Sequence, residues 1–310
     1  MIKYIFKRIL MMIPVILGIS FIIFAIMSFT PGDPAKLILG EDASEEDIME
    51  LREELGLNDP FLVRYVRYIG DAVRGDFGES YRSNTPVLRE ILDRFPTTFN
   101  IAFLGICLAV LVGVPIGIIS AVKQYSVVDT LSTIMAMLLT SMPGFFVGML
   151  LILFFSLTLN ILPATGISSW KHFIMPSMAV ASVTMASFIR MTRSTMLEVI
   201  RQDYVRTAKA KGAGGKRVVF HHCLRNALLP VVTVVGMNFA HQLGGTVMIE
   251  SVFAIPGLGT YMVNAVRMKD TPAVMGSIIF VAVIAGVVNL IVDVLYTYID
   301  PRVKTQYVKN

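Results

Sequence analysis

Residues whose types and spacing could support catalysis or metal binding are scarce in this sequence. His221 and His222 are adjacent, and neighbours on a helix point about 100° apart, so the two rings do not share a face. The two cysteines, Cys107 and Cys223, have no metal-ligand spacing and imply no disulfide framework. Residues 214–217 (GGKR) come nearest to a phosphate-binding loop but lack its upstream glycine and its hydroxyl residue. We therefore expect no catalytic site, no cofactor and no metal in this chain.

Polar side chains inside an apolar stretch form a more informative pattern. Asn238, His241 and Gln242 are spaced i, i+3 and i+4, so a helix places them on one face, which Gly245 continues. Polar groups within a membrane usually face protein or water rather than lipid. They either hydrogen-bond neighbouring helices or line a path for substrate. Both interpretations stay open, and the three polar residues are candidates for a substrate path.

The composition indicates that these residues belong to a membrane protein. Hydrophobic residues make up 55% of the chain and charged residues 16%, whereas soluble domains are about 25% charged. This composition leaves too little polar surface to face water. The formal net charge of +5 fits basic loops on the cytoplasmic side of a membrane. No basic stretch has the interleaved aromatic residues expected for nucleic-acid binding, so we expect no nucleic-acid partner.

Six apolar segments are long enough to cross a membrane as helices, which need about 20 residues each. They are residues 9–29, 98–121, 131–159, 173–190, 231–253 and 274–298. We expect Pro143 and Gly144 to kink or break the third segment and Pro176 to interrupt the fourth. Met142 and Phe145 lie beside the expected break. They are further candidates for the substrate path because they would form a constriction there.

Basic residues set the expected orientation of the spans. The segment 1–8 is basic, and the short connections on its side of the membrane hold more Lys and Arg than those on the other side. An even number of spans returns the chain to that side, where Arg302, Lys304 and Lys309 lie. We therefore expect both termini in the cytoplasm.

Residues 31–96 form a connection of different character, rich in acidic residues. Residues 43–57 are expected to form an amphipathic helix with Ser44 as its N-cap. Pro60 is expected to open a second helix, and residues 75–78 (GDFG) are expected to form a turn. We interpret this segment as a small excursion on the outer side that offers a docking surface to a soluble receptor.

The longest inner segment, residues 190–230, combines cations with little side-chain bulk and is expected to form a helix, a glycine-rich turn and a second helix. Small residues let a partner protein approach the backbone, and cations suit an acidic partner surface. On these features alone, an ordinary solvated basic loop is the simpler interpretation.

The amino-acid sequence of this segment resembles the cytoplasmic coupling loop of binding-protein-dependent ABC importers. Residues 203–212 (DYVRTAKAKG) and 224–230 (LRNALLP) are similar to the dipeptide, oligopeptide and nickel permease branch. Further matching motifs follow in order along the chain: PGDP (31–34), EELGL (53–57), GDFG (75–78), SMP (141–143), IPGLG (255–259), NLIVD (289–293) and DPR (300–302). The general loop begins Glu-Ala-Ala, whereas residues 206–208 here are Arg-Thr-Ala, so only Ala208 and Gly212 fit its short form. The candidate contact residues that the resemblance implies are Tyr204, Arg206, Thr207, Ala208, Ala210, Lys211, Gly212 and Gly215.

The resemblance implies an all-α ABC importer permease with the type I fold. It implies a second homologous permease subunit, two ATP-binding subunits that use ATP and magnesium, and an extracytoplasmic substrate-binding protein. The membrane would be the cytoplasmic (inner) membrane of a prokaryote, and this chain would not be an enzyme. We divide the chain into an N-terminal helix (1–30), the outer segment (31–96) and a five-helix core (97–310).

Alternatives to a peptide importer remain at this point. The motifs most resemble dipeptide and oligopeptide permeases, but a nickel or metal-chelate importer of the same branch is the second candidate. A secondary transporter would need a proton or sodium site near the midplane of the membrane, and His241 is its best candidate. Glu250 and Asp293, near the expected span ends, are the other ionisable groups to consider for proton movement.

Overall fold

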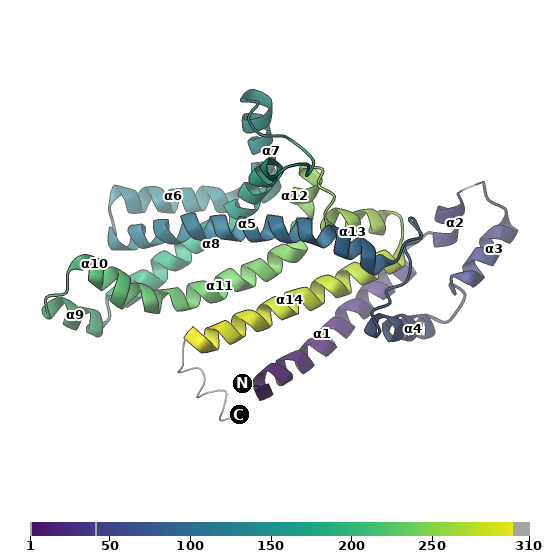
Figure 1. The fold of residues 1–310 in the computed structure, drawn as a ribbon, viewed down its shortest axis with the longest axis horizontal. Coiled ribbons are helices and arrows are strands. Elements are labelled where there is room, and N and C mark those ends of the chain that lie inside the picture. Colours follow the sequence, from purple (N-terminus) through teal and green to yellow (C-terminus); the bar gives the residue numbers. More distant parts are fainter. Residues whose placement is uncertain (1, 41, 300–310) are drawn as a thin grey trace. The chain divides into compact units, whose positions relative to one another are not determined.

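Helices account for almost all regular structure in the computed structural model, which describes residues 2–40 and 42–299. In that part of the chain the sole β-type pairing is an isolated bridge between Glu79 and Pro86. The expected all-α fold is therefore confirmed (Figure 1). The chain divides into two compact units, one formed by Met1–Thr98 with Pro256–Gly286 and the other by Phe99–Ile255 with Val287–Asn310.

The first unit contains the N-terminal helix and the short helices that follow it. Its elements are α1 (Ile2–Phe29), α2 (Pro34–Leu39), α3 (Glu45–Glu54), α4 (Phe61–Val73), the first turns of α5 (Val87–Val122), α13 (Leu258–Arg267) and the first half of α14 (Thr271–Ile299). Val87 and Ile91 of α5 belong to one buried core with Leu258 of α13 and Val274 of α14. The core therefore joins segments that are distant in sequence.

Local signals set the boundaries of the short helices as expected. The Ser44 hydroxyl accepts the backbone N–H of Asp47 and caps α3. Pro60 immediately precedes α4. In the expected turn, the Gly78 N–H donates to the Asp76 carboxylate, and Gly78 has a φ of 76°, which favours glycine.

The second unit contains most of the remaining long helices. Its elements are the rest of α5, α6 (Val127–Ser141), α7 (Gly144–Leu151), η1 (Ile152–Thr158), η2 (Trp170–Phe173), α8 (Ile174–Ile200), α9 (Asp203–Ala210), α10 (Gly215–Arg217), η3 (Val218–Cys223), α11 (Leu224–Gly245), α12 (Val247–Val252) and the end of α14. Gly117 of α5 lies so close to Thr192 of α8 that an added Cβ would be 2.7 Å from it. This glycine lets the two helices approach closely.

Among the described residues, five helices are long and apolar enough to cross a membrane, and a bent pair supplies a sixth span if its halves are counted together. The bent pair is Val127–Ser141 with Gly144–Thr158, and its halves meet at 100°. This agrees with the expected number of spans and confirms the expected break at Pro143. The DPR motif and the basic residues Arg302, Lys304 and Lys309 lie outside the described residues.

The expectation that Pro176 interrupts the fourth span was wrong. α8 continues through Pro176 and extends to Ile200. Pro176 is the third residue of the helix, where backbone N–H groups have no intrahelical acceptor, so its missing N–H breaks no hydrogen bond. Because α8 includes residues 190–200, the inner connection is shorter than expected.

The expected fifth span was also misplaced. α11 begins at Leu224, runs through Pro230 and ends at Gly245, and the separate short helix α12 follows. Glu250 lies in α12 and is fully buried, where its carboxylate accepts a hydrogen bond from the Thr246 hydroxyl at 2.9 Å. It is therefore an internal residue of the second unit and does not mark the end of a long span.

Candidate functional site

The connection between α8 and α11 folds as α9, a glycine-containing turn and α10, which lie together at one end of α8 and α11 (Figure 1). Val205 is the buried residue of α9 and belongs to a core with Ala121 of α5, Met196 of α8 and Ala227 of α11. A displacement of α9 therefore acts directly on the ends of three long helices. The packing role of Val205 was not predicted from the sequence, although Val205 is an apolar residue within a polar, amphipathic stretch.

The predicted contact residues form an exposed surface on α9 and the turn after it. Arg206, Thr207, Ala210, Lys211, Gly212 and Gly215 are exposed, and Ala208 is half-buried. Gly212 has a φ of +82°, and no described atom lies within 4 Å of the position that its Cβ would take. The turn thus offers backbone that a partner protein can reach.

Tyr204 has a different place from the other predicted contact residues. Its hydroxyl accepts a hydrogen bond from the Asn226 side-chain amide at 2.8 Å and donates to the His222 carbonyl at 3.4 Å. Tyr204 therefore fastens α9 to η3 and α11, while part of its ring remains exposed.

An ion pair with a buried carboxylate links α6 to α8 about two turns before α8 ends. The Arg193 guanidinium donates to both oxygens of the Asp129 carboxylate, at 2.7 and 2.9 Å. The same carboxylate accepts hydrogen bonds from the Ser120 hydroxyl at the end of α5 and from the Tyr125 N–H in the α5–α6 turn. Four donors satisfy both oxygens, as a buried carboxylate requires. We call Asp129 and Arg193 the α6–α8 pair.

The other end of α6 is held by a second arginine of α8. Arg190 donates to the Thr140 hydroxyl and, at 3.5 Å, to the Ala136 carbonyl. Between the two arginines, Ala136 packs against Ala186 and Ile189 of α8. α6 is therefore fixed to α8 along its length, up to the break at Pro143. The contacts of Arg190 and Arg193 with α6 were not predicted from the sequence. The one feature that marks Asp129 in the sequence is its position three residues after the N-cap Ser126.

The predicted substrate-path residues meet in one hollow of the second unit, with a volume of about 330 Å³. Phe145 of α7 lines it together with Asn238, His241 and Gln242 of α11. Met142 lies in the extended link before α7 and is not among the lining residues. The other lining residues are Gly144, Ala179, Val180, Val183, Thr184, Gly245, Thr246, Met248 and Ile249. No Asp, Glu, Lys or Arg is among these described residues.

Gln242 is a buried polar residue of this hollow, with 7% of its surface exposed. Its amide nitrogen is 3.4 Å from the Thr184 hydroxyl oxygen of α8, whereas its amide oxygen has no hydrogen-bond partner within the described chain. The Asn238 amide donates to the Val234 carbonyl of its own helix, and His241 is exposed. The hollow thus offers uncharged hydrogen-bonding groups on an otherwise apolar wall.

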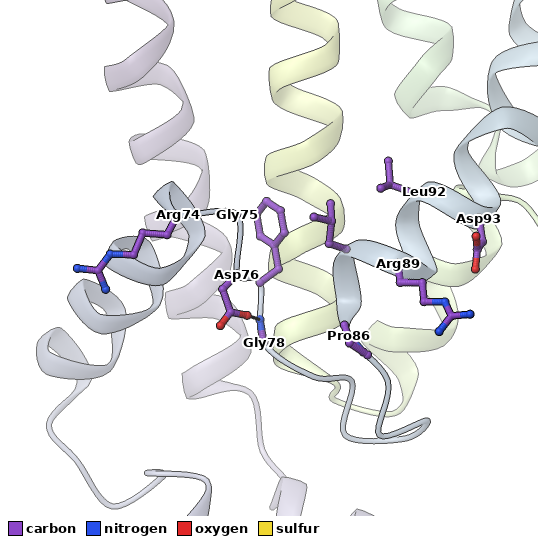
Figure 2. Close-up of a pocket in the computed structure, with 10 residues that line it drawn as sticks. Arg74, Gly75, Asp76, Gly78, Pro86, Arg89, Leu92 and Asp93 are labelled. Carbon is purple, nitrogen blue, oxygen red and sulfur yellow. Dashed lines mark hydrogen bonds between the residues drawn. The ribbon is translucent and has the colours of Figure 1, made fainter.

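Two polar hollows lie in the first unit. One, of about 500 Å³, lies between the residue 75–78 turn and the start of α5; Figure 2 shows Arg74 at one side and Arg89 with Asp93 at the other. The second, of about 380 Å³, is lined by Ser80, Arg82, Ser83, Glu90, Arg94, Pro256, Thr260, Tyr261, Asn264, Ala265, Met268 and Asp270. There, burial raises the pKa of the Tyr261 phenol to about 12, so the ring under Arg94 stays neutral at physiological pH.

Comparison with known proteins identifies the family. The model of the family "binding-protein-dependent transport system inner membrane component" matches residues 113–305, and that of its N-terminal region matches residues 1–102. This chain belongs to that family. It is therefore a multi-pass membrane protein and a permease of the ABC importer type. The fold also resembles that of the inward-facing MetNI methionine ABC transporter. The similarity covers 68% of this chain and 96% of the transporter chain, with a TM-score of 0.56 at 16% identity.

Curated relatives match the permease over nearly its whole length. It is 40% identical to the dipeptide transport system permease protein of Alkalihalophilus pseudofirmus, over 98% of this chain and 100% of that protein. It is 39% identical to the oligopeptide transport system permease protein of Bacillus subtilis, with coverage of 98% and 100%. The glutathione transport system permease protein of Escherichia coli is 41% identical, with coverage of 98% and 99%.

Within the described residues, no group of three or more His, Cys, Asp or Glu side chains is placed to hold a metal ion.

Proposed function

We propose that this permease imports peptides, using ATP hydrolysed by separate subunits, and that a second homologous permease subunit completes its pore. The observation that carries the proposal is the full-length similarity to three relatives named for dipeptides, oligopeptides and glutathione, itself a tripeptide. None of these relatives is named for nickel, so peptide is favoured over a metal or a metal chelate. The chain would reside in the cytoplasmic membrane of a prokaryote.

The chemistry of the hollow supports peptide as the cargo. Asn238, Gln242 and Thr184 present amide and hydroxyl groups, which can hydrogen-bond the peptide main chain whatever its side chains are. The absence of charged groups among the described lining residues avoids selection for one side-chain charge. We assign Phe145, Asn238, His241 and Gln242 to the substrate path, with Met142 beside it at the bend.

The exposed surface of α9 and the turn after it, residues 204–215, is the proposed coupling surface. It would receive the ATP-binding subunits, two in the complete transporter. Its exposed cations and the accessible backbone near Gly212 suit an acidic partner groove. Val205 would pass displacement of α9 to α8, and the α6–α8 pair would pass it on to the wall that carries Phe145. The outer segment (31–96), with its charged hollow at residues 74–93, would receive the substrate-binding protein.

Reconstitution tests this function directly. Proteoliposomes that contain the permease, its second permease subunit, the ATP-binding subunits and the substrate-binding protein should accumulate a labelled dipeptide only when ATP is present. A proton or sodium gradient without ATP should drive no uptake. Uptake driven by a gradient alone would indicate a secondary transporter, and ATP-dependent uptake of chelated nickel without peptide uptake would indicate the metal alternative.

The proposed orientation makes a separate prediction. With the native Cys107 and Cys223 replaced, Glu45→Cys in α3 should react with a membrane-impermeant maleimide from outside the cell. Ala210→Cys, at the end of α9, should react only in inside-out vesicles or permeabilised cells. Both positions are exposed in this chain, and the permease is labelled without its ATP-binding subunits and substrate-binding protein, so that accessibility depends on the side of the membrane alone. The opposite labelling pattern would reverse the orientation and the assignment of both docking surfaces.

A further inference from the structure

The helix α4 has an exposed apolar stripe that the proposed function does not use. Leu62, Val66 and Val73 are spaced i, i+4 and i+11, so they point in nearly the same direction on the helix. They are 62%, 66% and 81% exposed. Single exposed apolar residues are ordinary, but an aligned stripe on one helix is typical of a contact surface.

An adjoining, inner face of α4 shows where this helix lies along α1. The rings of Phe61 and Tyr65 contact those of Phe21 and Phe24, with centroids 5.2–5.6 Å apart. The Tyr65 hydroxyl also donates to the Leu17 carbonyl at 3.0 Å. Phe61 also stacks on Phe29, with centroids 5.5 Å apart, so the first turns of α4 lie along the last turns of α1 and not beyond its end.

These contacts place α4 at membrane depth. α1 provides the apolar span Ile5–Phe29, and Leu17 is its middle residue. At a rise of 1.5 Å per residue, Phe24 and Phe21 lie about 8 and 12 Å from Phe29 along the helix, which is within the nearer half of the roughly 30 Å hydrocarbon core. A second span agrees, because Tyr65 and Ile69 also belong to a core with Met275 and Ile279, within the first turns of α14.

The charged side of α4 fits the same position. Arg64 and Arg67 lie on the side away from the stripe; the Arg64 guanidinium is 5.6 Å from the centre of the Phe24 ring, and Arg67 pairs with Asp59. Arginine on one side and aliphatic residues on another are typical of helices that lie in the plane of the membrane interface. The neighbouring α1 is itself lined with exposed apolar side chains, so the stripe continues a lipid-facing surface.

We propose that α4 is a membrane-interfacial helix, whose Leu62–Val66–Val73 stripe inserts among the acyl chains of the leaflet at the Phe29 end of α1. The partner of this surface is lipid, not the substrate-binding protein. Receptor docking on the outer segment is thereby limited to α2, α3 and the charged hollow. The contacts with α1 and α14 that place α4 in the membrane are independent of peptide transport. The proposed orientation adds only that the leaflet at the Phe29 end is the outer one.

Tryptophan fluorescence tests the proposal in the assembled complex in proteoliposomes. The single native tryptophan, Trp170, is replaced by phenylalanine, and Val66→Trp is introduced as the reporter. Met49→Trp on α3 is the matched control, because Met49 is 61% exposed and Val66 66%. Phospholipids brominated on their acyl chains should quench the reporter at position 66 at least severalfold more than the control, and aqueous iodide should show the reverse preference.

Two outcomes would overturn the proposal. One is iodide quenching at position 66 equal to that at position 49. The other is a reporter that bromolipid does not quench and that addition of the substrate-binding protein shields from iodide, since a protein partner would then cover the stripe. Leu62→Trp is a second reporter on the same stripe and decides the question if the variant at position 66 does not assemble. None of these readouts requires transport, so they are independent of the peptide assignment.

Discussion

Replacement of Gly212 by tryptophan should abolish ATP-driven uptake while leaving the permease in the membrane. Gly212 lies in the exposed turn after α9, and no described atom lies within 4 Å of its Cβ position, so the new side chain meets no part of its own fold. It instead occupies the space through which a partner would reach the backbone. The left-handed φ of +82° adds strain of roughly 1–2 kcal/mol for a side-chain-bearing residue, which distorts the turn further. Uptake, ATPase activity and co-purification of the ATP-binding subunits measure the result.

Two control variants separate docking from strain. Gly212→Asn keeps a residue that tolerates the left-handed conformation and has little bulk, so coupling should survive. Gly40→Trp introduces the same bulk at another exposed glycine with φ of +91° and no described atom within 4 Å, but in the outer segment. That variant should still co-purify with the ATP-binding subunits. Normal uptake and normal association in Gly212→Trp would refute the coupling role of this turn.

Replacement of Asp129 by asparagine should lower the amount of peptide taken up per ATP hydrolysed, by roughly fivefold or more. The α6–α8 pair fixes α6 to the helix that leads into α9, and α6 in turn precedes the bend and Phe145. Without the pair, a displacement of α9 should still move α8, but it should no longer move α6 and the wall of the hollow together with α8. The measurement is uptake and ATP hydrolysis in the same proteoliposomes, expressed as a ratio.

Stability has to be separated from coupling in this experiment. Loss of one partner of a buried ion pair costs about 3–5 kcal/mol in general, although the 29% exposure of the Arg193 side chain reduces that cost here. The double variant Asp129→Asn/Arg193→Gln removes both charges and should recover thermal stability in detergent without recovering the ratio. Thr133→Val removes a hydrogen bond within α6 alone and is the matched control. An unchanged ratio in assembled Asp129→Asn complexes would show that the pair only supports the fold.

Together, these contacts describe one route through the second unit. α9 is fixed to α8 and α5 through Val205, α8 is fixed to α6 through Arg193 and Arg190, and α6 ends at the bend beside the hollow. Packed helices joined by satisfied polar contacts transmit displacement because they cannot slide without breaking those contacts. We propose that the coupling surface and the hollow, which lie in one compact unit, are mechanically connected by this route.

The amino-acid sequence by itself determined the features that depend on neighbours along the chain. Apolar runs of sufficient length predicted the spans, Ser44 and Pro60 predicted the starts of α3 and α4, and Pro143 predicted the break in the third span. The i, i+3, i+4 spacing placed Asn238, His241 and Gln242 on one face, and all three line the same hollow. Such features follow from backbone sterics, capping and helical periodicity, which act over a few residues.

Only the tertiary structure decided which distant residues meet. Asp129 and Arg193 are 64 residues apart, and neither position alone indicates its partner. Pro176 was expected to interrupt a span because proline usually breaks a helix, yet its place in the first turn of α8 makes it harmless. The outer segment was interpreted as a small excursion on the outer side, whereas Phe61 and Tyr65 pack α4 against the apolar span α1. Partners of this kind are selected by packing and by the need to satisfy buried polar groups, and these forces act between elements that the chain order does not place together.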